Sequence, residues 1–261
     1  MNHVTPAADI IPQVETVTIG GLPIAVLDRA GAAAQMLDAV ARHPRGKRPL
    51  FYTSANGEVI ARINTDARVA ALFRDADQIL ADGQPMVVAS RWLTRQPLPE
   101  RVATTDLFHD VARRAETTGQ SFYIFGAAAD ENARAVAAIR KAYPRLNISG
   151  ASHGYLQGAA LLAKLAEIDA LQPDVLWLAL GVPREQEFVR DHGHRLSHVG
   201  MIKTSGGLLN FLSGSRRRAP VWMQRLGLEW AFRTALEPKR LGWRYLTTNP
   251  TAMFMILTRS S

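Results

Sequence analysis

Asp82 is the carboxylate in this sequence that is best placed to do chemistry. It follows Gln78–Ala81, an apolar stretch expected to be a β-strand, and it precedes Gly83 and an expected helix. A carboxylate at such a strand end can act as a general base if it lies beside a substrate hydroxyl and stays ionised. It can also cap the helix that follows, and the spacing favours neither role over the other.

Glycine turns follow three further expected strands. They are Gly126 after Ser121–Phe125, Gly181 after Val175–Leu180, and Gly206-Gly207 after Val199–Thr204. Glycine lets the backbone approach a ligand closely, and the N-terminus of the next helix favours an anion. Ligands of open α/β sheets bind outside the carboxyl ends of the strands, so these turns predict a nucleotide-diphosphate site. The motifs G-x-G-x-x-G and G-x-x-x-x-G-K-[ST] are missing, which argues against dinucleotide oxidoreductases and P-loop ATPases.

Arg101 and Gln186 each have a structural and a functional interpretation. Arg101 is either a surface arginine beside a helix cap at Thr105 or a guanidinium that reaches a phosphate, for which its planar fork is suited. Gln186 opens the helix expected after Gly181, where it is either a capping or solvated side chain or a contact to a sugar or uracil.

Two motifs that can hold metals in other proteins predict no metal here. Asp75-Ala-Asp77 matches the D-x-D of many sugar-nucleotide enzymes, but we expect it at a helix end, away from the ligand edge of the sheet. His192-x-His194 lies in a basic, polar stretch and is interpreted as a solvated helix end. We therefore expect no metal site and no cofactor.

Apolar stretches of strand length alternate with Ala-rich stretches of helical length. The expected strands are Leu50–Thr53, Gln78–Ala81, Ser121–Phe125, Leu146–Ala151, Val175–Leu180 and Val199–Thr204. The expected helices are Gly57–Phe73, Met86–Arg95, Asp106–Thr118, Asp130–Tyr143, Ala159–Leu171 and Arg184–His194. This order predicts an α/β fold with a Rossmann-like, open, mostly parallel sheet and helices on both faces. Val14–Ile19 and Leu22–Val26, joined by Gly20-Gly21, predict a hairpin before it.

The composition changes after Leu212. Ser213-Gly214-Ser215 breaks the chain, and residues 216–244 then hold eight Lys/Arg against two acids, together with three of the five tryptophans. We expect a catalytic core over residues 1–212 and a helical appendage over residues 213–261. Cations among large aromatic side chains suit an anionic lipid surface, a phosphate-rich ligand or a nucleic acid.

The whole-chain composition excludes several classes of protein. The absence of cysteine excludes disulfides and thiolate metal sites, and a formal net charge of +8 favours anionic partners. No apolar stretch approaches the ~20 residues that span a bilayer, and the first 14 residues lack the basic-then-apolar pattern of a signal peptide. We expect a globular protein without a transmembrane helix.

Seven segments, taken together and in this order, resemble the WecG/TagA/CpsF family of glycosyltransferases. They are Thr53–Asn56, Ile79–Val87, Glu100–Phe108, Phe122–Gly126, Gly181–Phe188, Ser205–Phe211 and Arg217–Tyr245. The resemblance implies transfer of a sugar, with inversion, from a nucleotide sugar that is often UDP-linked to a polyprenyl-diphosphate-linked sugar in cell-surface polymer synthesis. It also implies a metal-independent reaction and a C-terminal appendage that attaches the enzyme to the membrane.

The resemblance assigns roles to individual residues. The family's proposed base falls on Asp82, and its E-R-V arginine falls on Arg101. The matched donor-binding positions are Asn56, Gly126, Gly181, Gln186, Gly206, Gly207, Arg240 and Arg244. Thr104-Thr105 replaces the family's usual Gly-[Ser/Ala] and is expected to contact the acceptor, and the stretch at Asn56 is one residue longer than the family's T-x-N.

The sequence thus predicts an inverting, UDP-sugar-dependent hexosyltransferase, peripheral on the cytoplasmic face of the cell membrane. The residues expected to hold the anionic membrane surface are Arg216, Arg217, Arg218, Trp222, Trp230 and Trp243. The alternatives are a nucleic-acid-binding protein and another Rossmann-like transferase that uses the basic segment for an anionic partner. We expect no nucleic-acid partner, and the sequence leaves homo-oligomerisation and the identity of the sugar open.

Overall fold

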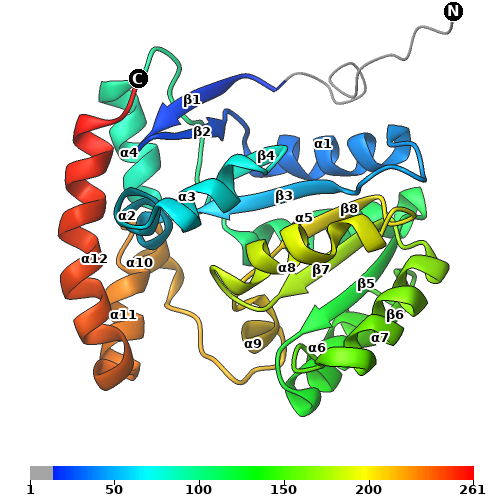
Figure 1. Ribbon diagram of the computed structural model, residues 1–261. Helices are drawn as coiled ribbons and strands as arrows, with labels where there is room; N and C mark the ends of the chain where they lie inside the picture. Colours follow the sequence, from blue (N-terminus) through cyan, green and yellow to red (C-terminus); the bar gives the residue numbers. More distant parts are fainter. Residues whose placement is uncertain (1–13) are drawn as a thin grey trace, which may run out of the picture.

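A six-stranded, all-parallel sheet forms the centre of the protein (Figure 1). The computed structural model describes residues 14–261, without the side chains of Arg225, Arg240, Arg244 and Tyr245. The strand order is β4-β3-β8-β7-β5-β6. The strands are β3 (Leu50–Ala55), β4 (Gln78–Ala81), β5 (Ser121–Gly126), β6 (Asn147–Ser152), β7 (Val175–Ala179) and β8 (Met201–Thr204). The expected Rossmann-like sheet is therefore confirmed.

Helices cover both faces of this sheet, which explains why its central strands are apolar throughout. The helices are α1 (Arg29–Arg42), α2 (Gly57–Thr65), α3 (Ala67–Arg74), α4 (Gln84–Leu93), α5 (Thr104–Thr118), α6 (Ala129–Ala142), α7 (Gly158–Leu171), α8 (Arg184–His192) and α9 (Leu208–Leu212). Trp177 of β7 packs into the core under α1, α5 and α6, whereas its neighbours Leu176 and Leu178 pack under α7 and α8. Successive side chains of a strand point to opposite faces, so both faces need apolar residues.

The strand order predicts that a ligand binds over β8 and β7. The chain leaves β3 for the neighbouring β4 on one side, and it leaves β5 for the neighbouring β6 on the other side. The direction in which successive strands are added to the sheet therefore reverses between the β3-β4 pair and the β5-β6 pair. In open α/β sheets ligands bind outside the carboxyl ends of the strands at such a reversal.

Two helices differ from expectation. Helix α1 was not predicted, although Asp28 caps it by accepting a hydrogen bond from the Gly31 amide at 2.6 Å. The single helix expected over Gly57–Phe73 is wrong, because Asp66 ends α2 and caps α3 through the amides of Arg68 and Val69. A residue that competes for backbone N–H groups favours a helix start over a helix interior.

The predicted hairpin forms, and the end of the chain pairs with it. Strand β1 (Thr16–Ile19) runs antiparallel to β2 (Leu22–Ala25). The backbone of Ser261 exchanges two hydrogen bonds of 3.0 Å with that of Thr18. The two ends of the described chain are therefore tied together.

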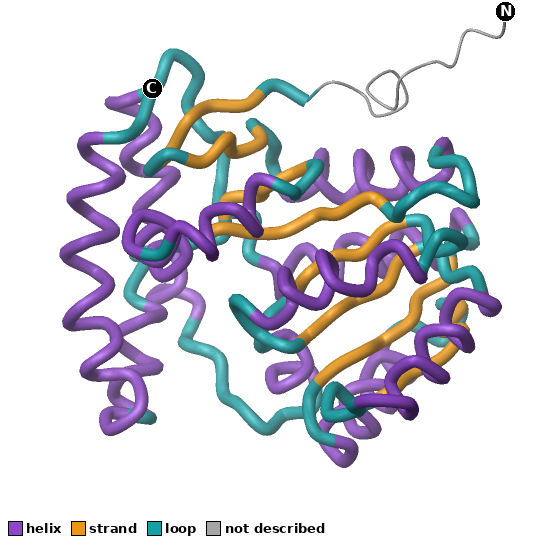
Figure 2. The backbone as a smooth tube through the Cα atoms, in the orientation of Figure 1, coloured by secondary structure: helices purple, strands orange, loops and turns teal. Residues whose placement is uncertain are grey.

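The C-terminal helices pack beside the β4 edge of the sheet. They are α10 (Val221–Arg225), α11 (Glu229–Leu236) and α12 (Pro238–Thr258). Figure 2 shows the loop after α9 crossing to them, and α12 packs along α2 with Ala252 and Ile256 buried. The predicted helices are present, while the division into domains 1–212 and 213–261 stays a prediction. Within the described residues, no helix is both long and apolar enough to span a bilayer.

Candidate active site

Asp82 lies at the carboxyl end of β4 with both carboxylate oxygens engaged. Its Oδ1 accepts hydrogen bonds from Arg101 Nη2 at 3.0 Å and Nε at 3.3 Å, and its Oδ2 accepts one from the Thr104 amide at 3.2 Å. The residue before helix α4 is Gly83, without a side-chain cap, so Asp82 does not cap that helix. Instead its carboxylate is held by an arginine and by the first amide of α5. Oδ1 already accepts two hydrogen bonds, whereas Oδ2 accepts one and keeps room for a further donor, as a base requires.

Arg101 joins Asp82 to the C-terminal helices. Its Nη1 donates to Glu229 Oε2 of α11 at 2.8 Å, so one guanidinium lies between two carboxylates. Burial opposes the charge of Arg101, but Asp82 and Glu229 outweigh it and raise its pKa. Arg101 is therefore a permanent cation that is only partly exposed, and not a free surface arginine. The cap expected at Thr105 is wrong, because α5 begins at Thr104 after Ala103.

A second ion pair fastens the C-terminal segment to α5. Arg218 donates to both carboxylate oxygens of Asp106, at 2.5 and 2.8 Å, and its Nε lies 3.9 Å from Glu229 Oε1. Burial alone would raise the pKa of Asp106, but the hydrogen bonds from Arg218 bring it below its ordinary value. Of the arginines predicted to contact the membrane, Arg218 thus has its guanidinium turned to the core. Its membrane role stays a prediction.

The glycine turns lie along the same edge of the sheet. Gly126 has φ +138°, and a Cβ there would lie 2.2 Å from the Ala179 carbonyl oxygen, so only glycine fits between β5 and β7. Gly181 and Gly206 also have positive φ, and a Cβ at either would meet nothing within 4 Å. Gly207 immediately precedes α9. The turns that follow β7 and β8 are therefore open to a ligand.

Glu185, which sequence reasoning missed, joins two of these turns. Its Oε2 accepts hydrogen bonds from the amides of Gly206 at 2.9 Å and Gly181 at 3.2 Å. The side chain is buried, and burial raises its pKa. Its only signal in the sequence is its place inside the Gly181–Phe188 stretch that resembles the family.

Gln186 and Thr104 are buried polar residues, and Asn56 has a structural role. Gln186 Nε2 donates to Thr53 Oγ1 at 3.2 Å, while its Oε1 has no hydrogen-bond partner among the described residues. Thr104 Oγ1 donates to Ser54 Oγ at 3.2 Å. The Asn56 side chain accepts from the Val59 amide and caps α2. A buried acceptor without a partner suits Gln186 to a ligand contact.

Lys203 is the second residue that the sequence did not reveal as functional. It lies in β8, fully buried, and its Nζ donates to Ser54 Oγ at 2.9 Å and to the Thr204 carbonyl at 2.8 Å. Burial lowers its pKa to about 8, although Glu185 and Asp82 favour its charge. Its signal in the sequence is a lysine inside an otherwise apolar strand.

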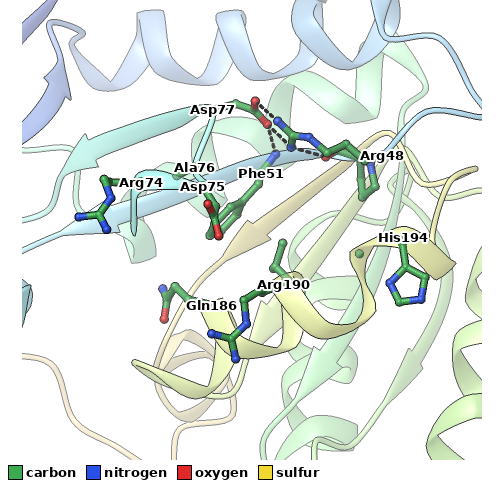
Figure 3. A pocket seen from close by; sticks show the side chains of 12 residues that line it. Arg48, Phe51, Arg74, Asp75, Ala76, Asp77, Gln186, Arg190 and His194 are labelled. Carbon is green, nitrogen blue, oxygen red and sulfur yellow. Dashed lines mark hydrogen bonds and ion pairs between the residues drawn. The ribbon is translucent and has the colours of Figure 1, made fainter. Parts of the chain in front are cut away.

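A groove of about 510 Å³ lies between α3 and α8, away from Asp82 (Figure 3). Gln186 lies near one end and His194 near the other, and Arg190 lies between them. Asp77 of the D-x-D motif lies before β4 and pairs with Arg48 at 2.6 Å, while accepting from the Phe51 amide. This carboxylate has a structural role at the amino end of the strand, as its position in the sequence predicted. Among the described residues, no three His, Asp or Glu side chains come together to form a possible metal site.

The geometry suits transfer of a group that leaves as an anion. Asp82 supplies a carboxylate, Arg101 a permanent positive charge, and the turns after β7 and β8 supply approachable backbone. All of them lie at the carboxyl edge of one parallel sheet, which defines a group-transferring enzyme of the Rossmann-like class. The chain belongs to the WecG/TagA/CpsF family of glycosyl transferases, whose family model matches residues 17–261. It is therefore a glycosyltransferase, and the resemblance seen in the sequence is confirmed.

Several curated relatives carry one name, N-acetylglucosaminyldiphosphoundecaprenol N-acetyl-beta-D-mannosaminyltransferase. The protein of Bacillus subtilis strain 168 is 33% identical over 210 residues, which cover 77% of this chain and 79% of the relative. Those of Bacillus spizizenii and Staphylococcus aureus strain MRSA252 are each 30% identical, covering 79% of this chain and 78% and 79% of the relative. The family match favours a glycosyltransferase over the other Rossmann-like transferases.

Proposed function

We propose that this protein transfers a hexose or N-acetylhexosamine, with inversion, from a UDP-sugar to a polyprenyl-diphosphate-linked sugar. The relatives' name specifies an N-acetylglucosaminyl-diphospho-undecaprenol acceptor and an N-acetylmannosaminyl group, which supports an acceptor of this class. The observation that carries the proposal is the Asp82–Arg101 pair at the carboxyl end of β4. A carboxylate and a cation side by side, at the edge where such folds bind ligands, support a base and a charge-stabilising group.

In this mechanism Asp82 takes the proton of the acceptor hydroxyl as its oxygen attacks the anomeric carbon. The bond from that carbon to the diphosphate oxygen breaks, and UDP leaves with the electron pair. A single displacement inverts the anomeric centre. Charge on the leaving UDP is stabilised by Arg101. The turns at Gly181 and Gly206, whose amides donate to Glu185, let the diphosphate approach the backbone closely.

The C-terminal arginines complete the donor site in this proposal. Arg240 and Arg244 lie in α12, but their side chains are outside the described residues, so their assignment rests on the resemblance. Gln186 would contact the sugar or the uracil through its unpartnered Oε1. We propose that the reaction needs no metal, since cationic side chains then balance the diphosphate charge.

The test is a screen of UDP-sugars against a short polyprenyl-diphosphate-sugar acceptor, with product mass as the readout. We expect Asp82→Asn to bind UDP normally and to lose roughly 10²–10⁴ in turnover, because the amide cannot accept the proton. Asp75→Asn is the matched control, an exposed acid before the same strand that should keep full activity. Near-normal turnover of Asp82→Asn would remove the base assignment, and activity lost in EDTA and restored by Mg²⁺ would refute metal independence.

We propose further that the C-terminal helices bind the cytoplasmic face of an anionic membrane. Trp243 is 76% exposed and Trp222 is 59% exposed, and Leu226, Leu246 and Phe254 are exposed on the same helices. Exposed tryptophans beside basic residues such as Arg217 suit the interface of an anionic bilayer.

Sedimentation with phosphatidylglycerol vesicles tests this surface. We expect Trp243→Ser to weaken binding several-fold, because the indole no longer enters the interface. Trp92→Ser, which removes an exposed tryptophan outside the C-terminal helices, is the control and should bind like the natural protein. Equal binding of all three proteins would contradict the proposed surface.

A further inference from the structure

Lys203 is a buried charge at the centre of the sheet. Its strand lies between β3 and β7, and its side chain is 0% exposed. A buried ammonium group is costly unless it is paired and hydrogen-bonded, so its retention requires an account. The hydrogen bonds to Ser54 and to the Thr204 carbonyl satisfy two of its three N–H donors.

On one side, Lys203 faces Glu185 of α8. The carboxylate of Glu185 accepts from the amides of Gly181 and Gly206, and its Oε1 accepts from Gln186 Nε2 at 3.4 Å. A group that only accepts hydrogen bonds suits the ionised form. The positive charge of Lys203 stabilises this form against the cost of burial.

On the other side, a chain of hydrogen bonds leads from Lys203 to Asp82. Lys203 Nζ and Thr104 Oγ1 both donate to the Ser54 hydroxyl oxygen, at 2.9 and 3.2 Å. The backbone amide of the same Thr104 donates to Asp82 Oδ2 at 3.2 Å. The ammonium group therefore fixes Ser54 and, through it, the residue that holds the proposed base.

We propose that Lys203 is a positioning residue that holds two carboxylates in place: Glu185, which joins the donor turns, and Asp82, the base. This inference rests on the proposed function, in which Asp82 accepts the proton. The charged groups facing Lys203 are Glu185 and Asp82, and Asp82 is faced in addition by Arg101, which Glu229 of α11 also contacts. Lys203 itself does not reach the substrate, because it is fully covered.

The proposal predicts a change in the alkaline limb of the pH profile. Burial lowers the pKa of Lys203 to about 8, so its charge is lost as the pH rises through that value. Transfer and UDP binding should then fall together above about pH 8, because Glu185 and Asp82 lose their counter-charge. In Lys203→Met this alkaline limb should disappear, because the variant has no ammonium group that could lose its charge.

Ser54→Ala provides a second test in case Lys203→Met fails to fold. It removes one hydrogen bond to the ammonium group but keeps the charge, so the alkaline limb should move to lower pH. Ser149→Ala is the matched control. Ser149 lies on the far edge strand β6 and donates to the Phe122 carbonyl of β5. Its profile should equal that of the natural protein. Circular dichroism establishes which variants are folded.

The experiment measures transfer and calorimetric UDP binding from pH 5 to 10 for all four proteins. An alkaline limb unchanged in Ser54→Ala and in a folded Lys203→Met would overturn the role of Lys203 while leaving the proposed function intact. A natural protein that neither binds UDP nor transfers from any UDP-sugar would overturn the proposed function, and this inference with it. A purely structural lysine would lower activity equally at every pH.

Discussion

Two groups of charged side chains lie at the site, each with positive and negative members, and they differ in their exposure to water. The core pair, Lys203 and Glu185, is buried within the sheet layer, at 0% and 3% exposure. The seam cluster lies between the core and the C-terminal helices, and its side chains are 15–27% exposed. Its members are Asp82, Arg101, Asp106, Arg218 and Glu229.

This difference separates a fixed scaffold from an exchangeable contact. Lys203 and Glu185 interact as buried opposite charges without a direct ion pair, and loss of either leaves the other charge uncompensated. The core pair therefore cannot change partners during a reaction. A partly exposed pair contributes less, because water and ions replace its contacts at small cost. The seam cluster can therefore exchange a carboxylate for a phosphate. In the proposed mechanism the core pair does not exchange and only holds the glycine turns that receive the diphosphate.

Glu229 is the carboxylate that such an exchange would displace. It accepts from Arg101 at 2.8 Å, on the opposite side of the guanidinium from Asp82. The diphosphate carries the same kind of charge and can form the same hydrogen bonds. The acid from α11 thus marks a place at Arg101 where an anionic ligand can bind.

The largest effect that separates the two groups is expected from Arg101→Met. Loss of the cation leaves Asp82 without its main partner and the leaving UDP without its charge stabilisation, so turnover should fall by about 10²–10³. Steady-state transfer assays measure this loss. Because the seam is more exposed than the core pair, the variant should still fold, with an unfolding temperature that falls less than that of Lys203→Met.

Arg95→Met is the control for Arg101→Met. It removes an exposed arginine from the loop after α4 and should leave turnover unchanged. If Arg101→Met instead kept its turnover but lost its fold, Arg101 would be a structural residue like the core pair. The distinction between the two groups would then be wrong.

The seam cluster was only partly predictable from the sequence. Asp82 follows a predicted strand and could be placed at the ligand edge from that position, whereas Arg101 was assigned to the site through the family resemblance. Glu229 lies 128 residues after Arg101 and reaches it because the chain returns from α9 to the β4 edge. No spacing rule connects residues so far apart, so the sequence suggested arginines in this segment and missed its acid.

The core pair was missed because strand order differs from chain order. Lys203 meets Ser54 since β8 inserts beside β3, its neighbour in the sheet but not in the chain. In a strand of four residues, a lysine is easily taken for an exposed residue near the strand end. Its burial becomes evident only once the register with β3 is known. The sequence predicted the alternation of strands and helices, which depends on local pattern, and missed α1, although Asp28 is placed to cap it.

The smallest expected effect comes from Glu229→Gln, which tests the exchange itself. The neutral amide keeps the shape of the side chain but competes less for Arg101, so UDP should bind more tightly by roughly threefold to tenfold, about 1 kcal/mol. Calorimetry at low salt measures it, and the gain should shrink at high salt because the seam is screened. Glu167→Gln, on α7 and paired only with Lys164 among the described residues, is the control. Weaker UDP binding would mean that Glu229 orients Arg101 for the ligand, and the seam would then be as fixed as the core pair.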